Sequence, residues 1–543
     1  MSTEIDYLSM DLNKIVLAYQ QLFLSRLQHI LPIKINKPIL PDDLTSKFYY
    51  VEVAEVLYNL NINNTVLIKR QDIVKLYNLL ITEISNKVTQ RLKVTNKLQL
   101  LFVYYSLAAY FAEFHGRITQ LLKKEMRIED FNNIMDSEIK ILEVVKENSN
   151  FLPEIDSLKA LDKATIQYLI NMIVYSESSD TYTAEIKDIF EFFFLAGALI
   201  RLISERELVT SNTINEIAIE IRNYSILFND DYMKIMKNYS TNLLEESSED
   251  FIVEDTIAIL ENNFAKVNGF NLLTVENMLE NTGRSFKDKF VCNLIDRPSL
   301  LSIISQDGEC SYKEAENLLN YMIISRPSSS EFIYKSFDKH EKRIFEFPFL
   351  QVNIFTDVEA FLFSYPLLLH SYMLLRKKLL YNLIPECQKY NSRIIDKKIK
   401  NKFVKEVEKI LKPYTKLILT NVQKLENQEI TIYLEREIDL LAVTEESLLL
   451  FECKDVYYSF SAAACRQDLS DCIRFINNIM LKVEEIEQKQ TKIKKYLQFD
   501  FNSIHPVLVY KNYNVSIDSL IDKKGVIVTS HSKLAEFMEV FCH

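Results

Sequence analysis

Glycine is scarce in this chain, and its scarcity argues against two common nucleotide-binding loops. Only six of the 543 residues are glycine, and no stretch fits GxxxxGK(S/T) or GxGxxG. Those loops need glycine because the backbone must approach a phosphate closely. A P-loop ATPase and a Rossmann dinucleotide site are therefore disfavoured. The GxSxG nucleophile elbow and the HExxH zinc motif are absent as well.

Cysteine is also sparse, and the seven cysteines are scattered. They form no CxxC pair, and they stand at Cys292, Cys310, Cys387, Cys453, Cys465, Cys472 and Cys542. A structural zinc site is disfavoured because such sites use closely spaced cysteine pairs. An odd, scattered set is typical of a reducing compartment.

Long apolar runs are missing. Two runs stand out, residues 100–112 and 192–200, and both fall short of the roughly 20 residues that a membrane-spanning helix needs. The first residues, Met-Ser-Thr-Glu-Ile-Asp, contain neither a basic n-region nor an apolar h-region. The sequence therefore predicts a cytoplasmic protein without a membrane partner.

Positive charge is not in excess, since the formal net charge is −11. A nucleic-acid binder needs only a local basic patch, however, and one basic stretch precedes the last third of the chain. It includes Arg376, Lys377, Lys378, Lys389, Arg393, Lys397, Lys398, Lys400, Lys402 and Lys405. We expect it to contact a nucleic-acid backbone; the alternative is a solvated helical face that balances acidic segments.

Residues 1–330 have the periodicity of helices, with Ser, Thr, Asn and Asp at many expected helix starts. One of these helices is expected over residues 213–228, and strand-like alternation is confined to residues 48–53. We therefore expect a multidomain α+β protein with a large all-helical domain over residues 1–330. An acidic loop at residues 245–250 marks a candidate sub-boundary. Residues 331–375 are expected to form a bridge that packs onto a C-terminal domain, residues 376–543.

The clearest chemical motif is a hairpin near the C-terminus. Glu437-Ile-Asp439 opens one apolar strand, a Thr-Glu-Glu-Ser turn follows, and the next strand ends in Glu452-Cys-Lys454. Because side chains alternate along a strand, Glu437 and Asp439 share a face, as do Glu452 and Lys454. Burying these charges on an apolar hairpin is costly without a partner. A divalent metal held by Asp439 and Glu452 would be such a partner.

This arrangement resembles the PD-(D/E)xK nuclease superfamily, with its restriction-endonuclease-like fold. Asp439 matches the first acidic position of the signature, Glu452 and Lys454 match the second, and Glu437 gives a Glu-x-Asp variant. The resemblance covers about the last third of the chain. It implies an α/β domain with a small mixed sheet, and Mg²⁺ bound by Asp439, Glu452 and the carbonyl of Cys453. It also implies that Lys454 positions and activates water.

Two flanking helices extend the resemblance. The helix at residues 402–411 is similar to the family's first helix, which often carries a glutamate facing the metal. Val404 stands at that position; either Glu406 or Glu408 substitutes for the glutamate, or the position is vacant. The helix from residue 461 is similar to the one that places a glutamine near the active site, and Gln467 is the candidate. Its alternative is a plain surface residue.

The resemblance implies a nuclease that hydrolyses phosphodiester bonds with Mg²⁺, for which Mn²⁺ would substitute because oxygen ligands at an open site suit both metals. DNA is the expected substrate, as for most of the superfamily. A nuclease joined to a helical domain for sensing, oligomerisation or regulation resembles bacterial antiviral defence or restriction effectors, so a homo-oligomer or regulatory partner is expected. Three alternatives remain: an RNA-directed nuclease, a helical interaction protein with an inactive nuclease fold, and an ordinary hairpin with surface ion pairs.

Overall fold

The structure, a computed structural model, describes most of the chain. The described residues are 12–30, 49–122, 125–131, 134–148, 152–176, 182–210, 218–228, 254–286, 292–324, 343–355, 358–395, 401–456, 462–514, 516–517, 519 and 521–542. The chain divides into two compact units. The first unit comprises Met1–Arg206, Ala218–Phe228 and Ile259–Leu379, and the second comprises the remainder, with Leu380–His543 as its main part. The candidate sub-boundary at residues 245–250 lies outside the described residues.

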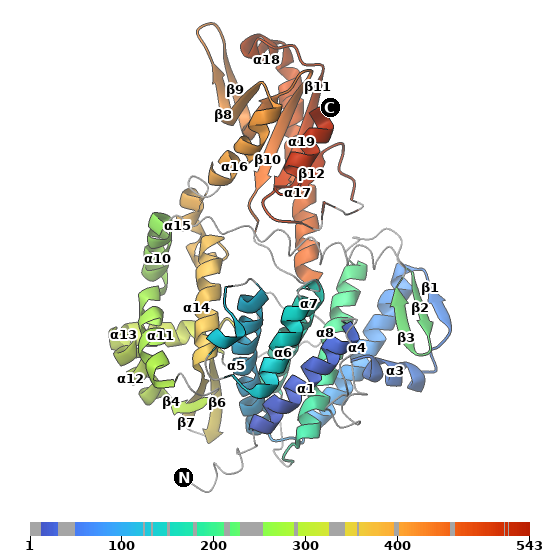
Figure 1. The fold of residues 1–543 in the computed structure, drawn as a ribbon, viewed down its shortest axis with the longest axis vertical. Coiled ribbons are helices and arrows are strands. Elements are labelled where there is room, and N and C mark those ends of the chain that lie inside the picture. Colours follow the sequence, from blue (N-terminus) through green and yellow to red (C-terminus); the bar gives the residue numbers. More distant parts are fainter. Residues whose placement is uncertain are drawn as a thin grey trace. The chain divides into compact units, whose positions relative to one another are not determined.

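Helices dominate the first unit (Figure 1). α5 (Lys97–Leu122) is mostly apolar and is buried along most of its length, as expected of a helix that others surround. It packs against α7 (Leu152–Tyr175), α6 (Asp136–Glu147) and α1 (Leu12–Ile30). The other helices of this unit are α3 (Tyr49–Asn59), α4 (Arg70–Leu92), η2 (Ile128–Asp130), α8 (Ile186–Thr210), α10 (Glu254–Asn268), α11 (Leu272–Phe286), α12 (Arg297–Asp307), α13 (Tyr312–Met322) and α14 (Tyr365–Leu380).

The first unit also contains two sheets, so the prediction of an all-helical region is wrong and the region is mostly helical. The smaller sheet is antiparallel, in the order β1-β2-β3. Its strands are β1 (Thr65–Leu67), β2 (Ile219–Arg222) and β3 (Ser225–Phe228). The helix expected over residues 213–228 is therefore a hairpin in the described part. Of the strand expected over residues 48–53, the described residues 49–53 lie in α3. Asn223 and Tyr224 both have positive φ, 51° and 57°, which gives the hairpin a two-residue turn.

The segment expected to form a bridge, residues 331–375, contains two strands and the start of α14 in its described part. The larger sheet of the first unit has the order β4-β7-β6-β5, with β4 (Asn293–Asp296), β5 (Ile323–Ile324), β6 (Phe349–Phe355) and β7 (Val358–Phe363). β6 pairs with β5, and β7 pairs with β4. Strands β6 and β7, which lie within residues 331–375, therefore belong to a sheet of the first unit.

The second unit is built on a five-stranded mixed sheet in the order β12-β11-β10-β9-β8 (Figure 1). β8 (Leu417–Glu426), β9 (Thr431–Val443) and β10 (Ser447–Lys454) form an antiparallel meander, and β11 (Ser503–Tyr510) and β12 (Ile527–Ser530) continue it in parallel. The parallel part follows from the long helical connection between β10 and β11, because parallel neighbours need a crossover.

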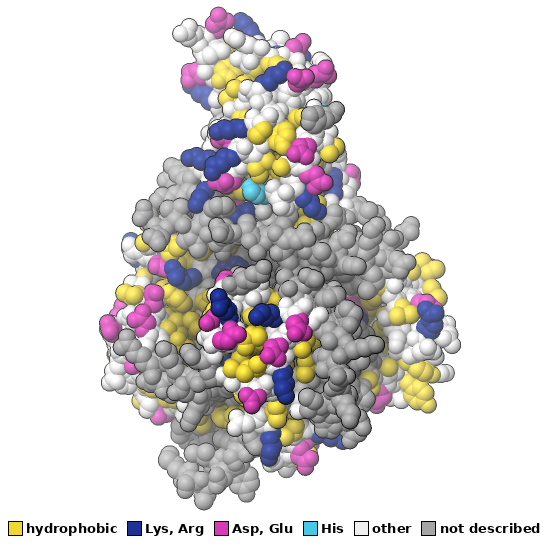
Figure 2. All heavy atoms as spheres, viewed as in Figure 1, with side chains coloured by type: hydrophobic (Ala, Val, Ile, Leu, Met, Phe, Trp, Pro, Cys, Tyr) yellow, Lys and Arg dark blue, Asp and Glu magenta, His cyan; other side chains and the backbone are white. Residues whose placement is uncertain are grey.

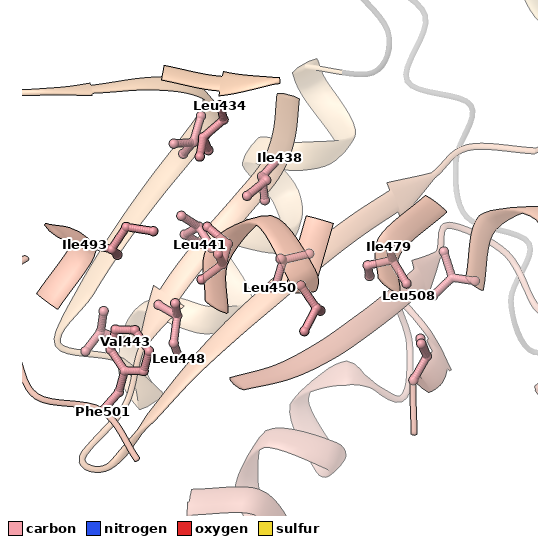
Figure 3. Close-up of a cluster of buried hydrophobic side chains, with 14 of the residues drawn as sticks. Leu434, Ile438, Leu441, Val443, Leu448, Leu450, Ile479, Ile493, Phe501 and Leu508 are labelled. Atoms are coloured by element: carbon pink, nitrogen blue, oxygen red, sulfur yellow. The ribbon is translucent and has the colours of Figure 1, made fainter. Parts of the chain in front are cut away.

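Helices cover both faces of this sheet. α16 (Asn401–Leu411) and α19 (Leu534–Cys542) pack on one face through an apolar cluster that includes Val407, Phe451 and Met538. α17 (Ala462–Gln488) and α18 (Gln490–Leu497) pack on the other. Figure 3 shows part of this second cluster, with Leu441, Leu450, Leu508 and Ile479 among its members. α15 (Pro385–Ile395) and η5 (Lys412–Tyr414) complete the described helices of this unit.

Candidate active site

Asp439 and Glu452 lie where the ladder between β9 and β10 ends. The last antiparallel partners in this ladder are Leu440 and Phe451. The next residue outward on each strand is therefore one of the two carboxylates. The hairpin thus brings the two predicted acidic positions to the same point of the sheet.

Alternation along the strands puts the charged side chains on the α17 side. Leu441 of β9 and Leu450 of β10 belong to the apolar cluster with α17. Asp439 and Glu452 are each two residues away from these leucines, and Lys454 is two residues beyond Glu452, so all three side chains project to that same face. The predicted motif therefore forms a single cluster under α17.

Hydrogen bonds fix the geometry of the cluster. The backbone N–H of Cys453 donates to Asp439 Oδ2 over 2.7 Å. Lys454 Nζ donates to Glu452 Oε1 over 2.5 Å, and Lys482 Nζ, from α17, donates to Glu452 Oε2. Each oxygen of Glu452 therefore has its own ammonium group. The ammonium of Lys454 also lies 4.9 Å from the centre of the Phe475 ring.

The surroundings shift the pKa values of the two carboxyl groups in opposite directions. Burial raises the pKa of Asp439, and the negative charge of Glu452 raises it further, against Lys454, the Cys453 N–H and Lys482. Burial also raises the pKa of Glu452, but the charges and hydrogen bonds of Lys454 and Lys482 outweigh it and lower that pKa overall. Pairs of acids whose environments separate their pKa values are common in catalytic sites.

The same edge of the sheet carries a second buried ion pair. Lys454 of β10 lies opposite Tyr510 of β11, and the backbone N–H of Lys511 donates to the carbonyl of Lys454 over 3.0 Å. Lys511 Nζ and Asp455 Oδ2 are 3.1 Å apart, with both side chains nearly inaccessible to solvent. This pair anchors the chain that follows each strand, and so stabilises the edge at which Lys454 ends β10.

The donor atoms fit a hard divalent cation. Asp439 and Glu452 contribute carboxylate oxygens from adjacent strands, and Mg²⁺ is usually bound through one or two carboxylates together with waters and substrate phosphates. Among the described residues, no group of three or more His, Cys, Asp or Glu side chains is arranged to hold a metal. The described protein groups at this point are two carboxylates, so any metal held here would need further ligands from water or substrate.

Three other predicted site residues have different surroundings from this cluster. Glu437 is exposed, and Glu435 and Arg436 are exposed with it, so strict alternation is interrupted just before Asp439. Gln467 is exposed on α17, eight residues before Phe475, which is about 12 Å along the helix axis. The side chain of Cys453 is buried in the cluster on the opposite face, and burial raises the pKa of its thiol.

The first helix brings no carboxylate to the cluster. α16 packs on the face opposite Asp439, Glu452 and Lys454, and Val404 is buried in that core. Glu406 accepts a hydrogen bond from Lys409 on the same helix over 2.9 Å. Val404, the position at which the resemblance expects a glutamate, is therefore part of the apolar core.

The basic stretch is divided. Arg376, Lys377 and Lys378 lie on α14 in the first unit, whereas Lys402 lies on α16 in the second. Arg376 pairs with Glu261 at 3.4 Å and Lys378 pairs with Glu346 at 2.5 Å. The side chain of Arg393, and the residues Lys397 and Lys398, are outside the described part. On the face shown in Figure 2, described Lys and Arg side chains are interspersed with Asp and Glu, so nucleic-acid contact by this stretch stays a prediction.

Two charged residues on α17 contact the strands of the candidate site and were not predicted from the sequence. Lys482 contacts Glu452, and Glu485 Oε1 accepts a hydrogen bond from the backbone N–H of Glu435 over 2.7 Å. Both stand within the row of α17 residues that face the sheet, which includes Ile479, Val483 and Ile486. Charged residues at apolar-face positions of a helix were the signal that would have indicated them.

The described helices include none with both the length and the apolarity needed to cross a membrane. Comparisons of the chain with protein-family models, with curated proteins and with solved structures each found no match.

Proposed function

We propose that this chain is a metal-dependent nuclease whose active site lies in the second unit, and that its substrate is DNA. The observation that carries the proposal is the convergence of Asp439, Glu452 and Lys454 on one face of the sheet, where β9 and β10 separate. The order of elements, a helix, a three-stranded meander, a helical connection and two parallel strands, supports the resemblance to the PD-(D/E)xK superfamily. The choice of DNA rests on that resemblance.

In this proposal Asp439 and Glu452 hold Mg²⁺, or Mn²⁺ in its place, through carboxylate oxygens. The bound metal supplies a water of lowered pKa and stabilises negative charge on the phosphate. Lys454, confined by Glu452 and the Phe475 ring, orients the attacking water and offsets charge in the transition state. The oxygen of water bonds to phosphorus while the bond to the leaving sugar oxygen breaks, which produces a phosphate monoester and a hydroxyl.

A cleavage assay tests the proposal directly. The purified chain is offered plasmid, linear duplex, single-stranded DNA and RNA with Mg²⁺ or Mn²⁺, and with EDTA as a control. We expect metal-dependent cutting of DNA that Asp439→Asn and Lys454→Met each reduce by at least about 10²-fold. Asp500→Asn is the matched control, because Asp500 is exposed and its ion pair is with Lys494, outside the cluster. Cutting of RNA alone would favour the RNA-directed alternative.

One observation favours the rival function, an interaction protein with an inactive nuclease fold. No third carboxylate joins Asp439 and Glu452 among the described residues. Calorimetric titration with Mn²⁺ separates the two readings: an active site binds Mn²⁺ in the wild type and loses it in Asp439→Asn. A wild type that neither binds Mn²⁺ nor cuts any substrate would exclude the nuclease.

A further inference from the structure

Lys482 is a second lysine at the carboxylate of Glu452. It comes from α17, 28 residues after Lys454, and its side chain is 8% exposed. Its ammonium contacts Glu452 Oε2, while Lys454 contacts Oε1. The two lysines therefore donate to the carboxylate from different elements. Lys454 lies on the strand that carries Glu452, and Lys482 lies on the helix that packs over it.

The position of Lys482 on α17 is costly for stability. It lies three residues after Ile479 and four before Ile486, both of which are fully buried against the sheet. An apolar side chain there would extend this row without removing an ammonium group from water. Replacing a whole buried ion pair by apolar residues of similar volume is often neutral or stabilising, although removing one partner alone is destabilising. The lysine is therefore better explained by what it does to Glu452 than by the stability of the fold.

We propose that Lys482 is a positioning residue for phosphodiester hydrolysis, acting through Glu452; this rests on the nuclease function proposed above. A carboxylate can accept about four hydrogen bonds, two on each oxygen. One ammonium on each oxygen holds the plane of the carboxylate and leaves acceptor capacity on both atoms for a metal. Lys482 thereby orients a metal ligand without being one.

The charges of the cluster agree with this role. Asp439 and Glu452 carry two negative charges, and Lys454 and Lys482 carry two positive charges, so the four groups sum to zero. A divalent cation raises the sum to +2, which matches the two negative charges of a phosphodiester and an attacking hydroxide. Without Lys482 the sum is +1. Its ammonium thus contributes positive charge that stabilises the negatively charged reacting groups. The same charge slightly weakens binding of the metal by repulsion.

These opposed effects define a test on the full-length chain. In Lys482→Met we expect kcat to fall on the order of 10²-fold, as for other losses of positioning at a reacting centre, with little change in KM. We expect Mn²⁺ to bind at least as tightly as in the wild type, by calorimetric titration, because a neighbouring positive charge is removed. Lys482→Arg keeps the charge and should recover about tenfold of the lost kcat, since the larger guanidinium fits less well.

Lys492→Met is the matched control, because Lys492 is exposed on α18 and outside the cluster; it should leave kcat and Mn²⁺ binding unchanged. An unchanged kcat in Lys482→Met would overturn the inference. So would a parallel loss of kcat, Mn²⁺ affinity and thermal stability, which is the signature of a purely structural lysine. If the wild type cuts no substrate and binds no Mn²⁺, the nuclease function fails and this inference fails with it.

Discussion

Two features of its surroundings disfavour ionisation of the carboxyl group of Asp468, on α17. Burial and then the negative charge of Asp471 raise its pKa to about 7, against a hydrogen bond from Asn514. In an unfolded chain an aspartate titrates near pH 4. Between about pH 4 and pH 7 the folded protein therefore keeps a proton that the unfolded chain has lost. Stability must fall as the pH rises through this window, because ionisation is easier in the unfolded chain.

Substitution of this one residue should remove its contribution to the pH dependence of stability. We expect Asp468→Asn to be more stable than the wild type by about 1–3 kcal/mol at pH 8, with the difference fading toward pH 4. Urea denaturation at a series of pH values measures it. Asp500→Asn, at an exposed aspartate, should follow the wild-type profile. Equal profiles for Asp468→Asn and the wild type would show that this carboxyl ionises normally.

At the scale of elements, β9 contains an irregular segment directly before the candidate site. Val422 of β8 lies opposite Ile438 and Lys424 lies opposite Tyr433, so Gln423 alone faces the four β9 residues between these pairs. The backbone N–H of Glu435, one of those four, is bonded to Glu485 of α17. α17 therefore stabilises the irregular segment that ends directly before Asp439.

Removal of this contact should loosen the segment. Glu485 is almost fully buried and also accepts from Lys489 Nζ over 2.5 Å. We expect Glu485→Ala to destabilise the fold by about 1–3 kcal/mol, because the N–H of Glu435 loses its acceptor. Amide exchange in a peptide covering residues 431–438 should accelerate, by mass spectrometry. Glu484→Ala, at an exposed position of the same helix, is the control; equal exchange in both variants would contradict this role.

The same elements show what could be predicted from the sequence. The sequence was sufficient to predict the cluster of Asp439, Glu452 and Lys454. Side chains alternate along a strand, so charged residues two apart at the end of an apolar strand share one face. β8 was not predicted, since most of its side chains are exposed and its pattern is weak. The β2–β3 hairpin was taken for a helix because its turn is Asn223-Tyr224, without the glycine that usually indicates such a turn. Helical periodicity could have indicated Lys482 as a charged residue on the apolar face of α17. Its contact with Glu452 depends on how the helix packs over the sheet, which local periodicity does not specify.

For the whole molecule, the important feature is that each unit has its own core. In the first unit, Arg26 of α1 makes two hydrogen bonds to Asp162 of α7, at 2.7 and 2.6 Å, and Tyr19 donates to the same carboxylate over 2.5 Å. Both members of this ion pair are buried. In the second unit, both apolar clusters consist only of residues between Phe403 and Met538. Separate cores are the basis of separate cooperative unfolding.

We therefore expect calorimetry of the full-length chain to resolve two transitions that respond to different substitutions. Asp162→Ala leaves Arg26 buried without its carboxylate, which typically costs about 3–5 kcal/mol, and should lower only the transition of the first unit. Leu508→Ala removes a fully buried side chain beneath α17, should cost about 2–5 kcal/mol, and should lower only the other transition. Mn²⁺ would identify the second transition by raising it, since a ligand stabilises the unit that binds it. A single transition lowered by both substitutions would mean that the two cores unfold together, and that the helical unit contributes to the stability of the second unit.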